Sequence, residues 1–94
     1  MNSYAIADRV AWMEPDTGDQ VYAAVLPDGP PVALEGTGSL IFLAIEPGGS
    51  LEDILARVSE AVEIEPSVIR SDVFTFVAEL VSLGLVAEGA PSGP

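Results

Sequence analysis

The segment Leu34–Ile45, with the sequence LEGTGSLIFLAI, is the part of the chain that most resembles a phosphate-binding loop. Two glycines flank Thr37, Ser39 follows them, and an uncharged apolar run completes the segment. Such turns bind phosphate through backbone N–H groups, in motifs that also require a lysine or a third glycine. The chain contains no lysine, and Ile41 occupies the position of the third glycine. The sequence therefore predicts a tight turn, in which Thr37 or Ser39 caps a buried helix, and no nucleotide site.

The acidic residues are the other candidates for chemistry. The chain has 15 Asp and Glu residues but no histidine and no cysteine. The absence of these two residue types excludes a Ser-His-Asp triad and the usual transition-metal sites. The segment EPDTGD lacks the glycine and glutamate spacing of a calcium loop, and the remaining acids are spread over predicted turns and helix surfaces. We therefore expect a protein that is not an enzyme and that binds no cofactor and no metal.

The charge balance limits the class of partner. An apolar content of 49% argues against disorder, while the net charge of −12 is extreme for 94 residues. Nucleic acids and anionic membranes are bound mainly through cationic side chains, so both are disfavoured as partners. A neutral or basic peptide or protein remains. The first ten residues lack the basic and long apolar regions of a signal peptide, and together with the absence of cysteine this favours a cytoplasmic protein.

Three strands are predicted in the first third of the chain. Arg9–Pro15 and Gln20–Leu26 have strand-like patterns and are separated by the turn DTGD. The second of them is apolar on both faces, which predicts a strand covered on two sides. A third strand is predicted over Pro31–Glu35. Because proline has no N–H to donate to a neighbouring strand, Pro30 and Pro31 place this third strand at the edge of the sheet.

Three helices follow. A short buried helix is predicted after Gly38, and Ser50 begins a second helix as its N-cap, with Asp53 completing a capping box. Pro66 suits the first turn of a third helix, and Gly84 suits its C-terminal cap. The order β-β-β-α-α-α predicts an α+β domain over residues 9–86. Residues 1–8 are predicted as an N-terminal segment and residues 87–94 as a flexible tail.

The third predicted helix has more apolar residues than one contact with a core requires. Five of them fall on one face at about 100° per residue, and we predict that they face the core: Ile69, Val73, Phe76, Leu80 and Leu83. Phe74 and Val81 form a shoulder beside this face, together with Val77 and Arg70. Exposed apolar surface beside an edge strand is a known arrangement for peptide docking.

The pattern of the whole chain resembles the PqqD-like family. The resemblance rests on VAW in the first strand, on LEGTGSLIFLAI, and on SLEDILARVSEAVEIEPSVIRSDVFTFVAELVSLGLV, which occur in the family's order and cover about residues 9–86. It implies a winged-helix-like fold with three antiparallel strands and three helices. Members of the family, which are also called RiPP recognition elements, bind the leader segment of a ribosomally made precursor peptide. They present it to a modifying enzyme in natural product biosynthesis.

The resemblance also implies where the leader binds, namely as a further strand at the edge of the third strand and against the third helix. The predicted peptide-binding residues are Val32, Ala33, Leu34, Ile69, Arg70, Asp72, Val73, Phe74 and Val77. In this hypothesis Phe74 is the anchor and Arg70 lies at the rim. Asp72 receives a basic leader residue from the opposite shoulder. The expected second partner is a separate enzyme, either a lasso-type leader peptidase or a radical-SAM enzyme.

Two alternatives come from other functional classes. A winged-helix DNA-binding regulator has the same outline, but its third helix would carry only Arg70 as a cation. An acidic protein–protein adaptor, such as a carrier with a covalently attached arm, would suit the charge. The segment GSL follows a predicted strand, however, and lacks the aspartate of a carrier's attachment site.

Overall fold

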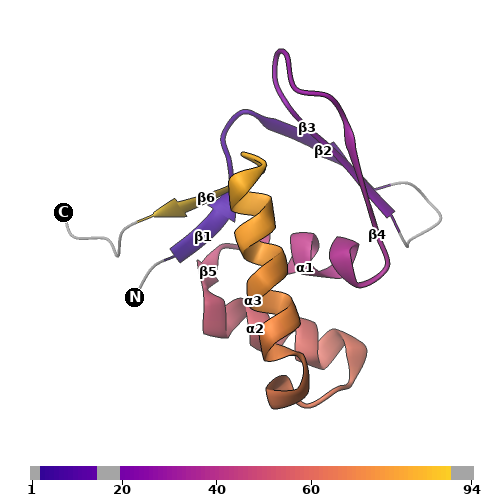
Figure 1. The fold of residues 1–94 in the computed structure, drawn as a ribbon, viewed down its shortest axis with the longest axis vertical. Helices are drawn as coiled ribbons and strands as arrows, with labels where there is room; N and C mark the ends of the chain where they lie inside the picture. The colour runs from indigo at the N-terminus through magenta and orange to yellow at the C-terminus, as the bar shows by residue number, and fades with distance from the viewer. Residues whose placement is uncertain (1–2, 15–19, 90–94) are drawn as a thin grey trace.

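The computed structural model describes residues 3–14 and 20–89, which form two small sheets and three helices (Figure 1). One sheet contains β2 (Val10–Met13), β3 (Gln20–Val25) and β4 (Val32–Glu35), in that order. The other contains β5 (Gly49–Ser50), β1 (Ser3–Ile6) and β6 (Val86–Gly89). The helices α1 (Thr37–Ile45), α2 (Leu51–Val62) and α3 (Pro66–Ser82) complete the fold.

The predicted α+β class is confirmed. From β2 to α3 the structure also has the predicted order of three strands followed by three helices, with the two-residue β5 inserted between α1 and α2. All pairs in the β2–β3–β4 sheet are antiparallel, with Trp12 opposite Ala23 and Ala23 opposite Val32. β4 is an edge strand, as its prolines predicted, and β2 forms the other edge. The predicted turn DTGD lies outside the described residues. The winged-helix likeness is loose, because a second sheet accompanies the helices.

The helix ends agree with the sequence at α2 and α3 but not at α1. The Ser50 hydroxyl accepts a hydrogen bond from the Asp53 N–H, and the Asp53 carboxylate accepts one from the Ser50 N–H, both at 3.1 Å. Gly84 follows α3 with φ of 80°, the left-handed conformation that ends many helices. The prediction that Thr37 or Ser39 caps α1 is wrong. Gly36 is the N-cap, and the helix start has no capping hydrogen bond from a side chain. The Ser39 hydroxyl instead donates to the Gly36 carbonyl at 2.7 Å.

The β5–β1–β6 sheet was not predicted. The residues expected to form an N-terminal segment contain β1, and β6 extends into the expected tail. Ser3 pairs with Gly89 and Ile6 with Val86, so the partners come from opposite ends of the chain. Local patterns carry no information about such distant pairing, and both strands have only 4 residues.

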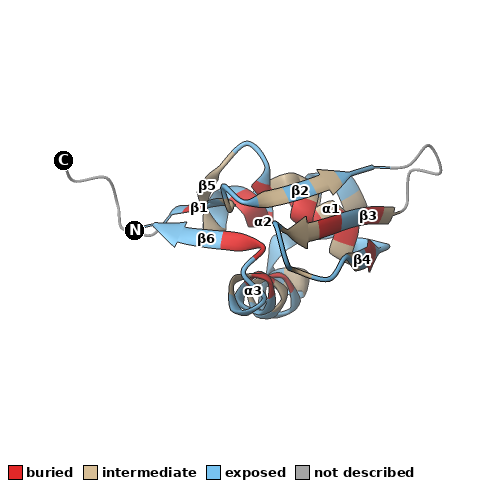
Figure 2. Ribbon diagram, turned by 90° about the horizontal axis from the view of Figure 1, so that it is seen from above, coloured by how far each residue is buried: buried red, intermediate tan, exposed pale blue. Residues whose placement is uncertain are grey.

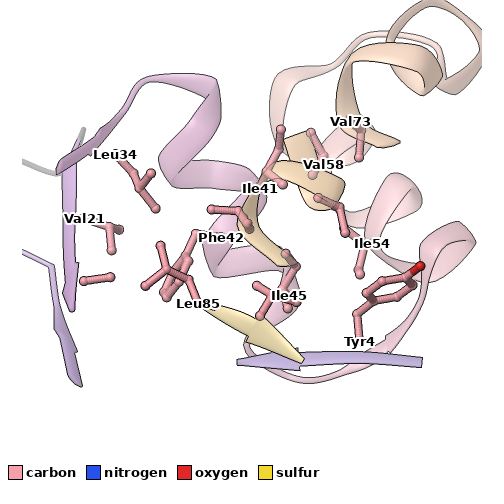
Figure 3. Packing of buried hydrophobic residues seen from close by; sticks show 14 of the residues in the cluster. Tyr4, Val21, Leu34, Ile41, Phe42, Ile45, Ile54, Val58, Val73 and Leu85 are labelled. Carbon is pink, nitrogen blue, oxygen red and sulfur yellow. The ribbon is translucent and has the colours of Figure 1, made fainter. Parts of the chain in front are cut away.

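The core lies between the two sheets and the helices (Figure 3). Phe42 on α1 is fully buried near its centre, with Val21 and Leu34 towards the β2–β3–β4 sheet and Tyr4 towards the other sheet. The Trp12 ring meets Phe42 edge to face, with 5.5 Å between ring centroids. β3 was predicted to be covered on both faces, but Tyr22 is exposed while Val21 and Ala23 are buried. Only the inner face of this sheet packs on the core.

Candidate peptide-binding site

β4 offers a strand edge that has no partner among the described residues. Its Val32, Ala33 and Leu34 pair with Ala23, Tyr22 and Val21 of β3, which accounts for one side of the strand. The Leu34 side chain is buried in the core, while Ala33 is exposed on the opposite face. The backbone groups on the outer side of β4 are therefore available to an added strand.

α3 lies between two edge strands, with β6 on one side and β4 on the other (Figure 2). It packs directly against β6, whereas it makes few close contacts with β4. An edge that a helix covers is protected from further pairing, while one that stands clear of the helix is not. The edge of β4 that faces α3 is therefore the candidate site, and one observation describes each of its ends.

At the upper end, an apolar pocket of about 270 Å³ opens between the start of β4 and the end of α3. Its lining comes from two segments that are distant in the sequence: Val25, Gly29, Pro30 and Val32 from one, and Leu83, Gly84 and Leu85 from the other. Leu83 is 54% exposed and so presents much of its side chain to this space. An apolar side chain of a bound peptide would find carbon surface here on both sides.

At the lower end, the Phe76 ring lies against the first turn of α1, which directly follows β4. A Cβ atom on Gly38 would come within 2.9 Å of the ring's Cζ atom. Only glycine therefore leaves room for the ring in this position. Phe76 and Leu83 are two helical turns apart, so both lie along the flank of α3 that faces β4. Asp72 lies one turn before Phe76, and Glu79 lies one turn before Leu83. Both acids are exposed, so this flank has an acidic rim.

The other flank of α3 faces α2 and β6. The Arg70 guanidinium lies 5.2 Å from the centroid of the Phe74 ring and forms an ion pair with Glu52 of α2 at 2.7 Å. A second pocket, of about 230 Å³, runs along this flank and is lined by Tyr4, Leu51, Phe74, Val77, Ala78, Val81 and Glu88. The Tyr4 hydroxyl donates to Glu88 at 3.1 Å. The pKa of Tyr4 is raised above its ordinary 10.0. The largest cause is burial, followed by this hydrogen bond and by the negative charge of Glu88.

The structure thus separates the predicted site residues into two groups. The β4 residues and Asp72 border the space between β4 and α3, with Ile69 half-buried and Val73 buried behind it. Phe74 and Arg70 lie on the opposite flank, and Val77 is buried beside them. Phe74 and Phe76 point about 200° apart around the helix axis. Any contact of Phe74 with a leader stays a prediction.

Two residues near this site were assigned by sequence to the core-facing side of the helix. Phe76 is half-buried and packs against the core, as predicted, with its ring also against Gly38 of α1. Leu83 was expected to face the core as well, but it is 54% exposed and lines the pocket beside β4. Helical spacing alone could not distinguish the two positions, because it does not show where the core ends.

An open strand edge beside an apolar pocket is an arrangement that peptide-docking domains use. The comparisons with known proteins identify the family of the chain. Residues 13–86 match the family described as Coenzyme PQQ synthesis protein D (PqqD), and the chain belongs to this family.

One solved structure, "TbiB1 in Complex with the TbiA(beta) Leader Peptide", has the same fold. It is 24% identical, the alignment covers 93% of this chain and 99% of that chain, and the TM-score is 0.77. The comparison with curated proteins gave no match. In the described part of the chain, no helix is long and apolar enough to cross a membrane.

Proposed function

We propose that this protein binds the leader segment of a ribosomally made precursor peptide and presents it to a separate enzyme, without catalysing a reaction itself. The observation that carries the proposal is the open edge of β4 beside an apolar pocket, in a chain of the PqqD family. The likeness in fold to TbiB1, which is described in complex with a leader peptide, supports it. The enzyme is a lasso-type leader peptidase or a radical-SAM enzyme, and the complex forms in the cytoplasm.

In the proposed complex, the leader pairs as a strand alongside Val32, Ala33 and Leu34. Its inward side chains contact Leu83 at the upper pocket and Phe76 at the lower end of the groove. Asp72 at the rim suits a basic leader residue, in keeping with the net charge of −12. This arrangement keeps the strand edge that the sequence predicted and transfers the role of aromatic anchor from Phe74 to Phe76.

Presentation needs no catalytic group on this protein. A leader held beside an enzyme keeps the attached core peptide near that enzyme's active site, at an effective concentration in the millimolar range for a short flexible connection. The carrier protein then only has to bind the leader and to bind the enzyme. The rate of modification at low peptide concentration should therefore depend on this protein, whereas the rate at saturating peptide should depend on it much less.

Strand addition is testable with synthetic leaders that carry single N-methyl groups. The probe is a fluorophore-labelled synthetic leader from a candidate precursor peptide of the host genome, and binding is followed by anisotropy. In an antiparallel pair, alternate residues direct their N–H groups to the partner strand. N-methylation should therefore weaken binding strongly at every second position of the paired segment and only weakly at the positions between.

A uniform effect along the leader, or none, would argue against strand addition. Amide shifts of isotope-labelled protein provide an independent location for the peptide. We expect the largest shifts in β4 and on the β4-facing flank of α3. Shifts confined to α2 or to the Phe74 flank would contradict the proposed groove even if the leader binds.

A further inference from the structure

The outer face of the β2–β3–β4 sheet exposes apolar side chains that the fold does not use. Met13 is 61% exposed and Tyr22 is 39% exposed. Met13 is paired with Tyr22, and Tyr22 with Ala33, so the three form one row across all three strands. Ala11 and Ala24 are paired in the next row, two residues along on β2 and β3. Residues directly opposite each other in an antiparallel sheet lie on the same face, so these rows form one continuous patch.

The patch has a shaped surface and a fixed aromatic residue. A shallow pocket of about 260 Å³ lies over it, and Ala11, Met13, Tyr22 and Ala24 contribute to its lining. The Tyr22 hydroxyl donates to the Gln20 side chain at 3.0 Å. The Gln20 amide in turn donates to Glu35 at 3.0 Å, which connects β3 to β4. The ring is thereby held in place, and a partner would lose little side-chain entropy on binding to it.

The patch continues into the proposed leader site. Its row ends at Ala33 on β4, and a strand added to β4 would place its own side chain beside Ala33 on the same outer face. A bound leader would therefore widen the patch by one strand. A protein that docks there would contact this chain and the leader together, and it would meet a smaller surface when the leader is absent.

The charge distribution decides between a second copy of this chain and a different partner. Glu14 and Glu35 are exposed at the borders of the patch, and the whole chain carries a net charge of −12. Two copies meeting through this face would bring these acids together, which is unfavourable. A partner with an apolar centre and basic residues around it would instead match both the patch and its rim.

We infer that the outer face of this sheet, centred on Met13 and Tyr22, is the docking surface for the enzyme that receives the leader. The inference rests on the proposed function. It assigns the two partners to two surfaces: the leader binds at the edge of β4, and the enzyme binds across the outer face of the sheet. The enzyme's contact surface should be apolar with a basic rim, and its affinity should be higher when the leader is bound.

The test uses Met13→Lys, which places an unpaired charge at the centre of the patch. Val68→Lys is the matched control, because Val68 is 70% exposed on the first turn of α3, away from this sheet. A purified lasso-type leader peptidase or radical-SAM enzyme of the host and the synthetic leader are the two probes, and the affinity for each is measured separately. We expect Met13→Lys to weaken enzyme binding at least about tenfold, as loss of an interface anchor does. Leader binding should be unchanged, and Val68→Lys should leave both affinities unchanged.

The outcomes separate the two ideas. If the unmodified protein does not bind the leader, the proposed function fails, and this inference fails with it. If the leader binds but both lysine variants bind the enzyme equally well, only the inference is overturned. Tyr22→Ala is the second variant, should Met13→Lys lower the melting temperature, and it should also weaken enzyme binding alone. Dimerisation of the unmodified protein in sedimentation, abolished by Met13→Lys, would assign the patch to a second copy and overturn the inference.

Discussion

The two edge strands β6 and β4 differ in how closely α3 packs against them. α3 packs against β6, and the Arg70 side chain covers the Phe74 ring on that flank. On the other flank, α3 makes few contacts with β4; Leu83 lines the pocket beside β4, and the Phe76 ring lies against Gly38 of α1. Both flanks carry an aromatic residue, so the presence of exposed apolar surface does not distinguish them. The two flanks differ instead in how closely α3 packs against the neighbouring strand.

The difference between the two edges follows from how each strand is connected to the helices. β6 follows α3 after a short turn, in which Gly84 adopts φ of 80° and the Leu85 N–H bonds to the Leu80 carbonyl at 3.0 Å. The chain therefore reverses tightly, and β6 lies close to the helix that precedes it. β4 instead leads into α1, and its position is set by β3 and by the core contacts of Leu34. α3 is connected to it mainly through α1, which contacts both α3 and β4.

The largest expected effect concerns the face of α3 between the two flanks. Leu80 is only 1% exposed, and Leu80→Ala should lower the free energy of unfolding by about 2–5 kcal/mol, because it removes buried carbon atoms and leaves a cavity. Urea unfolding followed by circular dichroism measures this loss. Leu83→Ala is the control on the β4 flank, and it should change stability by only about 0.5 kcal/mol because Leu83 is exposed. Equal losses for the two variants would show that the core does not divide the flanks as described.

The second prediction compares the flanks directly through leader binding. Phe76→Ala should weaken binding by about 1–3 kcal/mol, the range for an aromatic interface anchor. Phe74→Ala should have little effect, because the Phe74 ring faces α2 and β6 and stacks with Arg70. Anisotropy titration of the labelled leader against each variant measures both affinities, with thermal melts to verify folding.

The reverse result would favour the sequence-based hypothesis over the geometry. If Phe74→Ala weakens binding while Phe76→Ala does not, the leader lies along the second pocket and beside β6. That outcome would keep the function as a leader-binding protein but place the added strand on the other sheet. If neither variant affects binding in a folded protein, α3 contributes no aromatic anchor.

Much of the fold could be predicted because its signals are local. Pro30 and Pro31 indicated an edge strand, Ser50 and Asp53 indicated a helix start, and the apolar period indicated α3; the structure agrees on each point. The pairing of β1 with β6 could not be predicted, since its partners lie at opposite ends of the sequence. Such pairing depends on the completed fold rather than on any short pattern.

The site was predictable only in part for a related reason. Helical periodicity gives the angle between Phe74 and Phe76 but does not say which neighbouring element lies across from each. The outer face of β3 was misread because Tyr22 and Ala24 are apolar like Val21 and Ala23, so the expected alternation of polar and apolar residues is absent. That departure from the alternation is itself the signal of the proposed docking surface.

The smallest expected effect concerns Tyr4, on the flank of α3 that faces β6, and it depends on pH. Tyr4 is buried in the β5–β1–β6 sheet, and its hydroxyl donates to Glu88 of β6 at 3.1 Å. Because its pKa is raised in the folded protein above the 10.0 of an unfolded tyrosine, the neutral phenol is favoured by folding. This stabilisation is fully present below about pH 10 and is lost as the pH rises through the folded-state pKa.

Tyr4→Phe should therefore reduce the alkaline loss of stability, while lowering stability at neutral pH by about 0.5–1.5 kcal/mol through the missing hydrogen bond. Urea unfolding at a series of pH values from 7 to 11 (about one unit apart) measures both effects. Glu88→Gln is the companion variant, because it removes the charge but keeps an acceptor, and it should give an intermediate slope. Since Tyr4 and Glu88 lie on the flank of α3 that faces away from β4, neither variant should change the leader affinity at neutral pH. A weaker leader affinity in both would mean that the β6 side, and not β4, carries the peptide.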